Sequence, residues 1–400
     1  MIKELKFVNW KSFEDAHLWI DPLTFVIGTN SAGKSNIIDA LAFLSYAAQG
    51  KRLSDFGDKE IRGGIDGLIR RGQQTSTLSI TLPIGKDEYT YDISVEQNGK
   101  ELLVCDEKLV FRSSSGRETT LYLTDSASGT GTQIVARFPK DRPGPRKGIN
   151  VRRDISILSQ IQGLTVLKNI KEGASSVISV LTSIFILDPK PEQMRSYTPL
   201  SDTIASDGSN IAGVIAGLPT NKKQEFEKSL TNYVRRLPER DLKSIWAQTV
   251  GLFNSDAMLY CSEEWVDGTI MDFDARSMSD GTLRFIAIVS ALLTIPEGST
   301  LIIEEVDNGL HPSRAGELVS ALKEIGHNRE LDIVCTTHDP VLIDALGPEM
   351  LPFISCVTRS LQTGASQIQL LQDVPGLLKL LANYTPGGMM TNGLLKSTEE

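Results

Sequence analysis

The sequence predicts an α/β fold with a mixed central sheet, an antiparallel β-meander and a helical lobe. Near both ends of the chain, at residues 23–49 and 301–336, short apolar strand patterns lead through turns into helical patterns. This alternation of strand and helix predicts parallel strands. Between them, residues 78–137 carry clusters of β-forming residues separated by turn signals such as Asn98-Gly99, which predicts an antiparallel meander of about five strands.

The remaining elements follow from local patterns in chain order. Short apolar runs predict strands at residues 2–8, 23–27, 301–303 and 333–336. Helical apolar spacing predicts one or more helices in each of the segments 36–49, 154–187, 222–253 and 276–294. A short turn is expected at the start of the last segment. The sequence shows no internal repeat and no long heptad pattern, so we expect no extended coiled coil.

Residues 137–153 differ in composition from the strands before them. The segment has three prolines, which disfavour regular helix and sheet, and we predict an exposed loop. It carries seven basic residues against one acid, Asp141, for a local charge of +6. The basic residues are Arg137, Lys140, Arg142, Arg146, Lys147, Arg152 and Arg153. Two hypotheses remain open for this basic loop: a solvated insertion, or a surface that contacts DNA phosphates.

Composition sets broad limits on the kind of protein. The chain has 400 residues, 40% of them apolar, which is ordinary for a soluble protein and excludes collagen-like and mostly disordered classes. At ~150 residues per domain, this length predicts two or three domains or one large lobed domain. A net charge of −9 means that any nucleic-acid contact needs a local basic patch.

Cysteine usage and hydropathy indicate the compartment. The four cysteines form no C-x-x-C pair, which argues against a zinc ribbon or a disulfide scaffold and is consistent with a reducing environment. We find no apolar run of membrane-spanning length and no signal-peptide pattern at the N-terminus. The sequence therefore predicts a cytoplasmic protein that makes no membrane contact.

A phosphate-binding loop is the strongest motif. The run Gly28-Thr-Asn-Ser-Ala-Gly33-Lys34-Ser35 fits G-x-x-x-x-G-K-[ST] between a predicted strand and a predicted helix. Backbone N–H groups and the helix dipole bind phosphates in such a loop, while the lysine reaches the β- and γ-phosphates and the serine ligates Mg²⁺. The alternative is a glycine-rich turn that matches by chance, which the strand–helix context disfavours. The predicted nucleotide-binding residues are Gly28, Asn30, Ser31, Gly33, Lys34, Ser35 and Asn36.

Three later motifs are less specific when taken singly. Ser279-Asp280-Gly281 opens an apolar helix and predicts a second phosphate-binding helix terminus, although a simple helix cap has the same pattern. Glu304 and Glu305 end a buried strand, where acids can face a nucleotide or be merely solvated. His338 also follows a strand, where it can touch a γ-phosphate or be structural. Their order and spacing, 25 residues from Ser279 to Glu304 and 33 from Glu305 to His338, favour the functional interpretation.

Together these motifs make the chain resemble SMC/RecF-like ABC ATPases, and more narrowly prokaryotic AAA family ATPases of the OLD/RecF-like group. The opening Lys6-Phe-Val-Asn-Trp-Lys-Ser-Phe13 resembles the group's "NFKSF" strand, and Ser279 to Arg284 resembles its signature. Ile303-Glu-Glu-Val-Asp-Asn-Gly-Leu-His-Pro312 is similar to its "IEEPENGLHP". Glu304 stands where many ABC heads have Asp, and Val306-Asp307 replaces the usual Pro-Glu.

The resemblance implies a P-loop NTPase of the ABC ATPase head type with two lobes. We expect lobe I at about residues 1–153 plus 296–400, and a helical lobe II at about 154–295. The resemblance places the glutamine loop at no clear position. Gln160 is a weak candidate and Gln193 a weaker one.

The resemblance also implies the site. ATP and Mg²⁺ are the implied cofactors, with the metal held by Ser35 and, through water, by Glu304. Glu305 is the expected general base, and His338 orients the γ-phosphate. The signature residues Ser279, Asp280 and Gly281 of a second subunit close the site, so a homodimer or a higher assembly is expected. Asp307 lies where a loop coupling the two sites is expected.

Several functions are compatible with such an ATPase. The first hypothesis is a stand-alone subunit that controls a separately encoded effector, such as a Toprim-like nuclease, in antiphage defence, because 400 residues leave no room for a nuclease domain. The second is a RecF-like DNA-repair ATPase. The third is the ATPase of an ABC transporter, which the acid pair and the opening motif disfavour. A further alternative is a module in which bound ATP locks an assembly without turnover.

Overall fold

The computed structural model describes residues 1–57, 61–142, 144–238, 242–265 and 267–395, in two compact units. Unit 1 comprises Met1–Ile184, Phe353–Leu377 and Leu395–Glu400, and unit 2 comprises Phe185–Pro352 and Leu378–Leu394. This division differs from the expected lobes, because residues 154–184 fall in unit 1 and residues 296–352 fall in unit 2.

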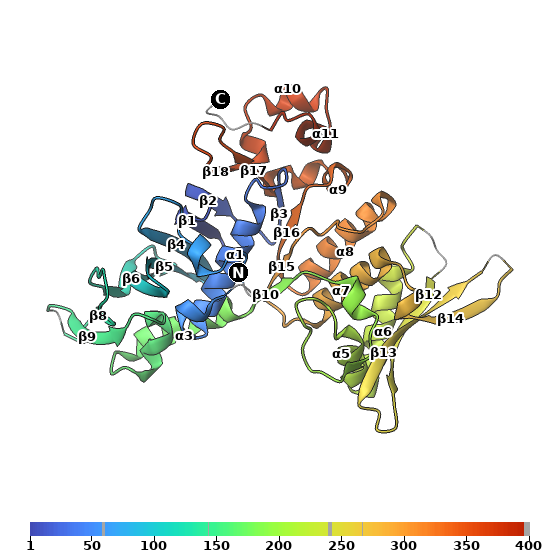
Figure 1. The fold of residues 1–400 in the computed structure, drawn as a ribbon, viewed down its shortest axis with the longest axis horizontal. Helices are drawn as coiled ribbons and strands as arrows, with labels where there is room; N and C mark the ends of the chain where they lie inside the picture. The colour runs from blue at the N-terminus through green and yellow to red at the C-terminus, as the bar shows by residue number, and fades with distance from the viewer. Residues whose placement is uncertain (58–60, 143, 239–241, 266, 396–400) are drawn as a thin grey trace. The chain divides into compact units, whose positions relative to one another are not determined.

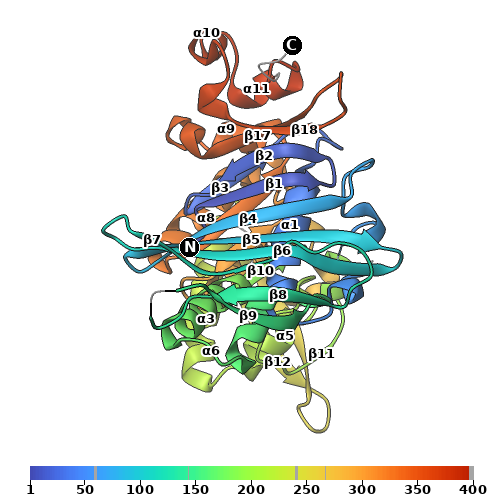
Figure 2. The same cartoon turned by 90° about the vertical axis from the view of Figure 1, so that its left-hand side faces the viewer.

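Unit 1 is built on a long mixed sheet (Figures 1 and 2). Its strands lie in the order β3-β17-β18-β2-β1-β4-β5-β6-β7-β8-β9. Strand β17 is parallel to β3 and β18 is parallel to β2, while all other neighbouring pairs in this order are antiparallel. The bounds are β1 Glu4–Trp10, β2 Phe13–Trp19, β3 Leu23–Ile27, β4 Thr75–Ile84, β5 Asp87–Asn98, β6 Glu101–Arg112, β7 Glu118–Thr124, β8 Gln133–Phe138, β9 Lys147–Arg152, β17 Ile354–Arg359 and β18 Ser366–Leu370. The predicted antiparallel meander is confirmed, with Gly99 at φ +61° in the turn between β5 and β6.

The helices of unit 1 pack around the apolar helix that follows the phosphate loop. That helix, α1 (Lys34–Ala48), is buried on most of its faces and contacts α3 (Lys168–Thr182). The unit also contains α2 (Ile157–Gln160) and the 3₁₀ turns η1 (Leu53–Asp55), η2 (Ile65–Gly67), η3 (Ile161–Gly163) and η7 (Leu371–Asp373). Burial on all sides explains why α1 has no clear polar face in the sequence.

Unit 2 holds a run of three neighbouring strands, of which two are shown to be parallel, and a separate antiparallel sheet (Figure 1). The first has the order β10 (Ile184–Leu187), β15 (Thr300–Ile303) and β16 (Asp332–Thr337), and the second has β11 (Thr198–Pro199), β13 (Asp256–Glu264) and β12 (Leu242–Val250), with β14 (Ile270–Asp274) paired to β13. Its helices are α4 Pro191–Met194, α5 Ile211–Gly217, α6 Thr220–Val234, η4 Ala275–Ser277, α7 Asp280–Thr294, η5 Pro312–Arg314, α8 Ala315–Asn328, α9 Pro340–Ala345, η6 Pro348–Phe353, α10 Leu377–Leu381 and α11 Pro386–Thr391.

The mixed α/β fold class is confirmed, but two predicted elements are wrong. The helical pattern predicted through residues 222–253 ends with α6 at Val234, and residues 242–250 form strand β12. Ile245 and Ala247 of β12 are buried, while Ser244 and Trp246 on the alternate positions are partly exposed. This alternation has the period of two that a half-buried strand requires, and the adjacent amphipathic helix masked it.

The predicted basic loop is wrong at both of its ends. Its first two residues, 137 and 138, belong to β8, and residues 147–152 form β9, which pairs antiparallel with β8 from Gln133–Arg152 to Phe138–Lys147. Pro139 and Pro145 therefore lie in the connection between these strands, where no ladder N–H is required, and Pro143 lies outside the described residues.

Several of the segment's basic side chains are also already paired. Arg153 is fully buried and donates to Glu96 and to the carbonyls of Val104 and Gly131. Arg137 pairs with Asp125, and Arg152 pairs with Asp154. Three of the seven basic side chains are thus paired with acids of unit 1, which halves the local charge of +6 expected from the sequence.

Candidate functional site

The phosphate loop lies between β3 and α1 in unit 1, and its glycines have no room for a side chain. Gly28 has φ +155°, and a Cβ there would lie 2.3 Å from the carbonyl oxygen of Val357. Gly33 has φ +120°, and a Cβ there would lie 2.5 Å from Ser366 Oγ. Both positions therefore require glycine, as a loop that brings its backbone close to phosphates does.

The amine of Lys34 folds back over this loop. Its Nζ donates to the carbonyl oxygens of Gly28 at 2.6 Å and Thr29 at 3.1 Å, and the residue is buried. Helix α1 starts here with no side-chain cap and no acid in its first turn. A cation and an uncapped helix N-terminus at one place suit an anionic ligand, so the residues present fit a bound phosphate.

Two hydroxyl groups and one side-chain amide from distant segments brace the loop. Ser366 Oγ donates to the carbonyl of Ala32 at 2.5 Å and shares a second hydrogen bond, of 2.7 Å, with Ser12 Oγ. The side-chain amide of Asn36 donates to the same Ser12 Oγ at 2.7 Å. Asn36, expected to bind nucleotide, thus braces the loop, and Ser12 of the opening motif belongs to this network. Asn30 and Ser31 are exposed on the loop itself.

Arg62 contacts the predicted metal-binding serine. Its Nη1 donates to Ser35 Oγ at 2.9 Å, and its backbone carbonyl accepts from Lys11 Nζ, which also pairs with Asp39. Serine at this position is the protein hydroxyl that a phosphate loop offers to Mg²⁺. Sequence reasoning missed Arg62, which lies 27 residues beyond the motif and carries no local signal.

The acid pair in unit 2 lies in a tight turn at the carboxyl end of β15. Strands β15 and β16 are parallel, so Glu304 and Glu305 and the residues after Thr337 lie at the same sheet edge. The N–H of Glu305 donates to Thr336 Oγ1 at 2.9 Å. Glu305 has φ +44°, an uncommon conformation for a residue with a Cβ.

Arg284 holds this turn from the signature helix α7. Its Nη2 donates to the carbonyl oxygens of Glu304 at 3.0 Å and Glu305 at 2.8 Å, and its Nη1 donates to Pro189 at 3.0 Å. Burial lowers the pKa of Arg284, while the carboxylates of Asp188 and Asp307 favour its charged form. The sequence contained a signal for the structural role of Arg284. It is a charged residue within an apolar helix pattern, since it follows Leu283 and precedes nine residues of mainly apolar character.

The signature residues lie on the same part of unit 2. Ser279 caps α7, and its Oγ accepts from the N–H of Thr282 at 3.2 Å, so the helix-cap interpretation of this serine holds in the structure. A Cβ on Gly281 would lie 2.7 Å from the carbonyl oxygen of Gly309. Arg314 Nη1 donates to Thr282 Oγ1 at 3.2 Å. The signature turn and the loop after the acid pair therefore pack directly against each other.

A family model described as "AAA domain, putative AbiEii toxin, Type IV TA system" matches residues 23–344. The chain belongs to this AAA domain family. The match includes the phosphate loop, the signature, the acid pair and His338, and it confirms the predicted resemblance.

Curated relatives of this AAA domain protein are similar over limited segments. The DNA replication and repair protein RecF of Corynebacterium jeikeium is 27% identical over 24% of the chain and 21% of its own length. The DNA double-strand break repair Rad50 ATPase of Sulfolobus acidocaldarius is 29% identical over 26% of the chain and 11% of its own length. The matched segments thus span only 21% and 11% of the length of these two relatives.

Solved structures share the fold of the AAA domain protein. An Smc head bound to the C-winged helix domain of ScpA has a TM-score of 0.53 at 14% identity, covering 92% of this chain and 97% of the other. An Smc head with an extended coiled coil, bound to the C-terminal domain of ScpA derived from Pyrococcus furiosus, has a TM-score of 0.52, also at 14% identity, covering 96% and 99%. The protein therefore has the fold of an SMC-type ABC ATPase head.

Two buried polar atoms near the acid pair have no hydrogen-bond partner among the described residues. They are Asp307 Oδ1 and His338 Nδ1. Burial raises the pKa of the Asp307 carboxyl, while Thr337 and His338 act in the opposite direction. Buried polar atoms of this kind are normally satisfied, so this corner of unit 2 offers two unused hydrogen-bonding atoms to a water molecule or a ligand.

The glutamine-loop candidates do not have a free amide at this site. The Gln160 amide group is used within unit 1, where it bonds the backbone of Arg152, Ile155 and Ser156. Gln193 is exposed on α4. Across the described ranges, His, Cys, Asp and Glu side chains form no cluster of three or more suited to a metal ion, and no helix there is long and apolar enough to cross a membrane.

Proposed function

We propose that the protein binds ATP with Gly28, Asn30, Ser31, Gly33, Lys34 and Ser35 and hydrolyses it. The observation that carries this proposal is the phosphate loop, where two glycines admit no side chain and a lysine amine lies over an uncapped helix N-terminus. Positioning and charge neutralisation are the main requirements of phosphoryl transfer. Lys34 supplies a positive charge to the β- and γ-phosphates.

Two acids have separate roles in this proposal. Glu305 accepts the proton of the attacking water, and His338 orients the γ-phosphate. Ser35 and, through water, Glu304 hold Mg²⁺, which would neutralise phosphate charge. The contacts of Glu305 with Arg284 and Thr336 support its role, because a general base needs a fixed position.

A second copy completes the site in this proposal. The signature turn Ser279–Gly281 of the partner closes on the nucleotide bound by Lys34 and Ser35. Support comes from the position of this turn at the start of α7, because the backbone N–H groups of a helix N-terminus suit an oxyanion. Asp307, with its unpartnered oxygen, is placed to couple the two sites.

We further propose that the ATPase controls a separately encoded effector, such as a Toprim-like nuclease, in antiphage defence in the cytoplasm. Support comes from the family description, which names a putative AbiEii toxin and a type IV toxin–antitoxin system. Purification of the native protein from its source checks this directly. A nuclease that co-purifies in an ATP-dependent manner is expected, and replication or repair proteins in its place would contradict it.

A RecF-like DNA-binding role is the second candidate, favoured by the matches to RecF and Rad50. Lys140 and Arg142 in the β8–β9 connection are exposed, and Arg146 and Lys147 donate only to the carbonyls of Thr120 and Thr165. Reversal of these four charges to Glu should weaken salt-sensitive DNA binding. Unchanged affinity would remove the hairpin from consideration as a DNA contact.

ATP turnover of the purified protein tests the enzymatic proposal. We expect Mg²⁺-dependent phosphate release that the substitution Glu305→Gln abolishes. ATP binding without turnover, with and without DNA, would instead favour a module that ATP locks into an assembly.

A further inference from the structure

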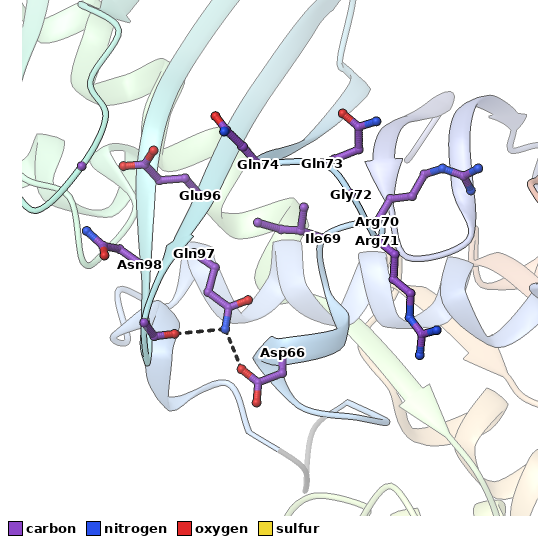
Figure 3. A pocket seen from close by; sticks show the side chains of 12 residues that line it. Asp66, Ile69, Arg70, Arg71, Gly72, Gln73, Gln74, Glu96, Gln97 and Asn98 are labelled. Carbon is purple, nitrogen blue, oxygen red and sulfur yellow. Dashed lines mark hydrogen bonds between the residues drawn. The ribbon is translucent and has the colours of Figure 1, made fainter.

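Unit 1 contains a polar pocket that the proposed ATPase mechanism does not use. It has a volume of about 600 Å³ and lies between the loop after η2 and the β5–β6 hairpin (Figure 3). The residues that line it are Asp66, Ile69, Arg70, Arg71, Gly72, Gln73, Gln74, Glu96, Gln97, Asn98, Gly99 and Gly129. None of them belongs to the phosphate loop or to the acid pair. A volume in this range accommodates a small organic ligand.

The pocket has unused hydrogen-bonding groups on two sides. Among the described residues, the side chains of Arg71, Gln73, Gln74 and Asn98 form no hydrogen bond or ion pair with the protein. An arginine offers five donors, and each carboxamide offers two donors and an acceptor. Figure 3 shows Arg71 on one side of the pocket and Asn98 on the other, with Ile69 between them.

The two acids of the pocket are already occupied by other residues. Glu96 accepts from the buried Arg153 at 2.6 Å, and Asp66 accepts from Gln97 Nε2 at 2.5 Å. Among the described residues, neither carboxylate forms an ion pair with Arg71. The guanidinium of Arg71 is therefore available to an anion from outside, while the second oxygen of Glu96 can still accept a hydrogen bond.

We propose that this pocket is a second nucleotide site, which takes a nucleoside monophosphate. Arg71 binds the phosphate, because a guanidinium fork matches phosphate oxygens. The face of the base packs on Ile69, and its polar edge bonds the carboxamides of Gln74 and Asn98, since amide side chains match the donor–acceptor pattern of a base edge. The same chemistry is offered by a free nucleotide and by one nucleotide of a single strand.

Calorimetric titration of the full-length protein tests the proposal. Nucleoside monophosphates are added in saturating Mg²⁺ and ADP, so that the phosphate loop is already filled. We expect binding that Arg71→Ala weakens by about 10-fold or more, the usual effect of losing a hydrogen bond to a charged group. Gln74→Ala should weaken it less. Arg117→Ala, which removes another exposed arginine of unit 1 from the connection between β6 and β7, should leave it unchanged.

A second arm of the experiment separates the two sources of the nucleotide. If monophosphates do not bind but single-stranded oligonucleotides do, and Arg71→Ala weakens their binding while Arg117→Ala does not, the pocket takes a nucleotide of a strand. No binding of either probe would overturn the proposal. Binding of these probes that Arg71→Ala leaves unchanged would also overturn it. Because ADP fills the phosphate loop throughout, failure here leaves the proposed ATPase function standing.

Discussion

The phosphate loop and the acid pair are held in place by opposite means. In unit 1, main-chain geometry shapes the loop, and an added Cβ at Gly28 or Gly33 would clash within 2.5 Å of a neighbour. In unit 2, the acid-pair turn depends on hydrogen bonds that Arg284 donates and on one that Thr336 accepts, and both residues lie 20 or more residues away in the sequence. The first site is therefore sensitive to added atoms, and the second to the loss of hydrogen-bond partners.

This difference has a practical consequence for substitutions. Changes at the phosphate loop should act mainly on nucleotide binding, because the loop itself contacts the ligand. Changes around the acid pair should act mainly on turnover, because they alter the position of a single carboxylate. Substitutions at the two sites can therefore be distinguished by measuring ATP affinity and ATP turnover separately.

Glu305→Gln is the strongest test of the claim that changes at the acid pair act mainly on turnover. The amide cannot accept a proton, so we expect kcat to fall by roughly 10²–10⁴-fold, the usual contribution of a general base, while ATP affinity stays within a few-fold. Steady-state phosphate release and equilibrium ATP binding measure the two quantities. Glu304→Gln is the matched control, with a loss attributable to Mg²⁺ binding that excess Mg²⁺ partly restores. Wild-type turnover in Glu305→Gln would contradict the assignment.

Lys34→Ala tests the phosphate-loop half. The substitution removes the amine that donates to the carbonyls of Gly28 and Thr29, and with it the positive charge offered to the β- and γ-phosphates. We therefore expect ATP affinity to fall by about 100-fold or more. Calorimetry or a fluorescent nucleotide gives the affinity directly. A variant that binds ATP normally but turns over slowly would break the proposed separation of binding from turnover.

Arg284→Met removes the donors that fix the acid-pair turn while keeping an unbranched side chain. The carbonyls of Pro189, Glu304 and Glu305 would lose a buried partner, so we expect the protein to lose about 2–4 kcal/mol of unfolding free energy and kcat to fall about 10-fold. Urea unfolding and ATP turnover at a temperature where the variant is folded measure both effects. ATP affinity should be retained, and Arg284→Lys should restore part of kcat. Loss of ATP affinity with unchanged kcat would contradict the positioning role.

Glu107 provides a stability test far from both sites, with no expected effect on turnover. This buried carboxyl accepts from Tyr122 and from the N–H groups of Ile157 and Leu158, and burial raises its pKa to about 7. Between its unfolded pKa near 4.5 and this value, the folded state holds the extra proton. Stability should therefore fall as pH rises through this window, by up to roughly 3 kcal/mol, and then level off.

Glu107→Gln removes this titration. We expect its unfolding free energy to change less between pH 5 and pH 8 than that of the wild type, as measured by urea unfolding at both values. Steeper loss of stability in the variant than in the wild type over this range would contradict the raised pKa. Turnover at pH 7 serves as the check that the site itself is intact.

The sequence predicted those features whose cause is local. The strand–glycine–helix run identified the phosphate loop, and the parallel strands β15 and β16 followed from two short apolar runs. Arg62, Thr336 and the bracing Ser366 could not be predicted, because each contacts its target across 27 or more residues. The prediction of an exposed basic loop at residues 137–153 was wrong at its ends for the same reason. Arg153 bonds Glu96 and Val104, and only the folded sheet brings these residues together.

The claim that a second copy completes each site is tested most directly by mixing two inactive variants. Lys34→Ala removes the phosphate loop of one chain, and Ser279→Arg blocks the signature of the other. If the signature acts on the partner's nucleotide, mixed dimers contain one intact site, and random mixing should restore about a quarter of wild-type ATP turnover. A mixture that stays as inactive as its two components, under conditions where the chains exchange, would contradict the account.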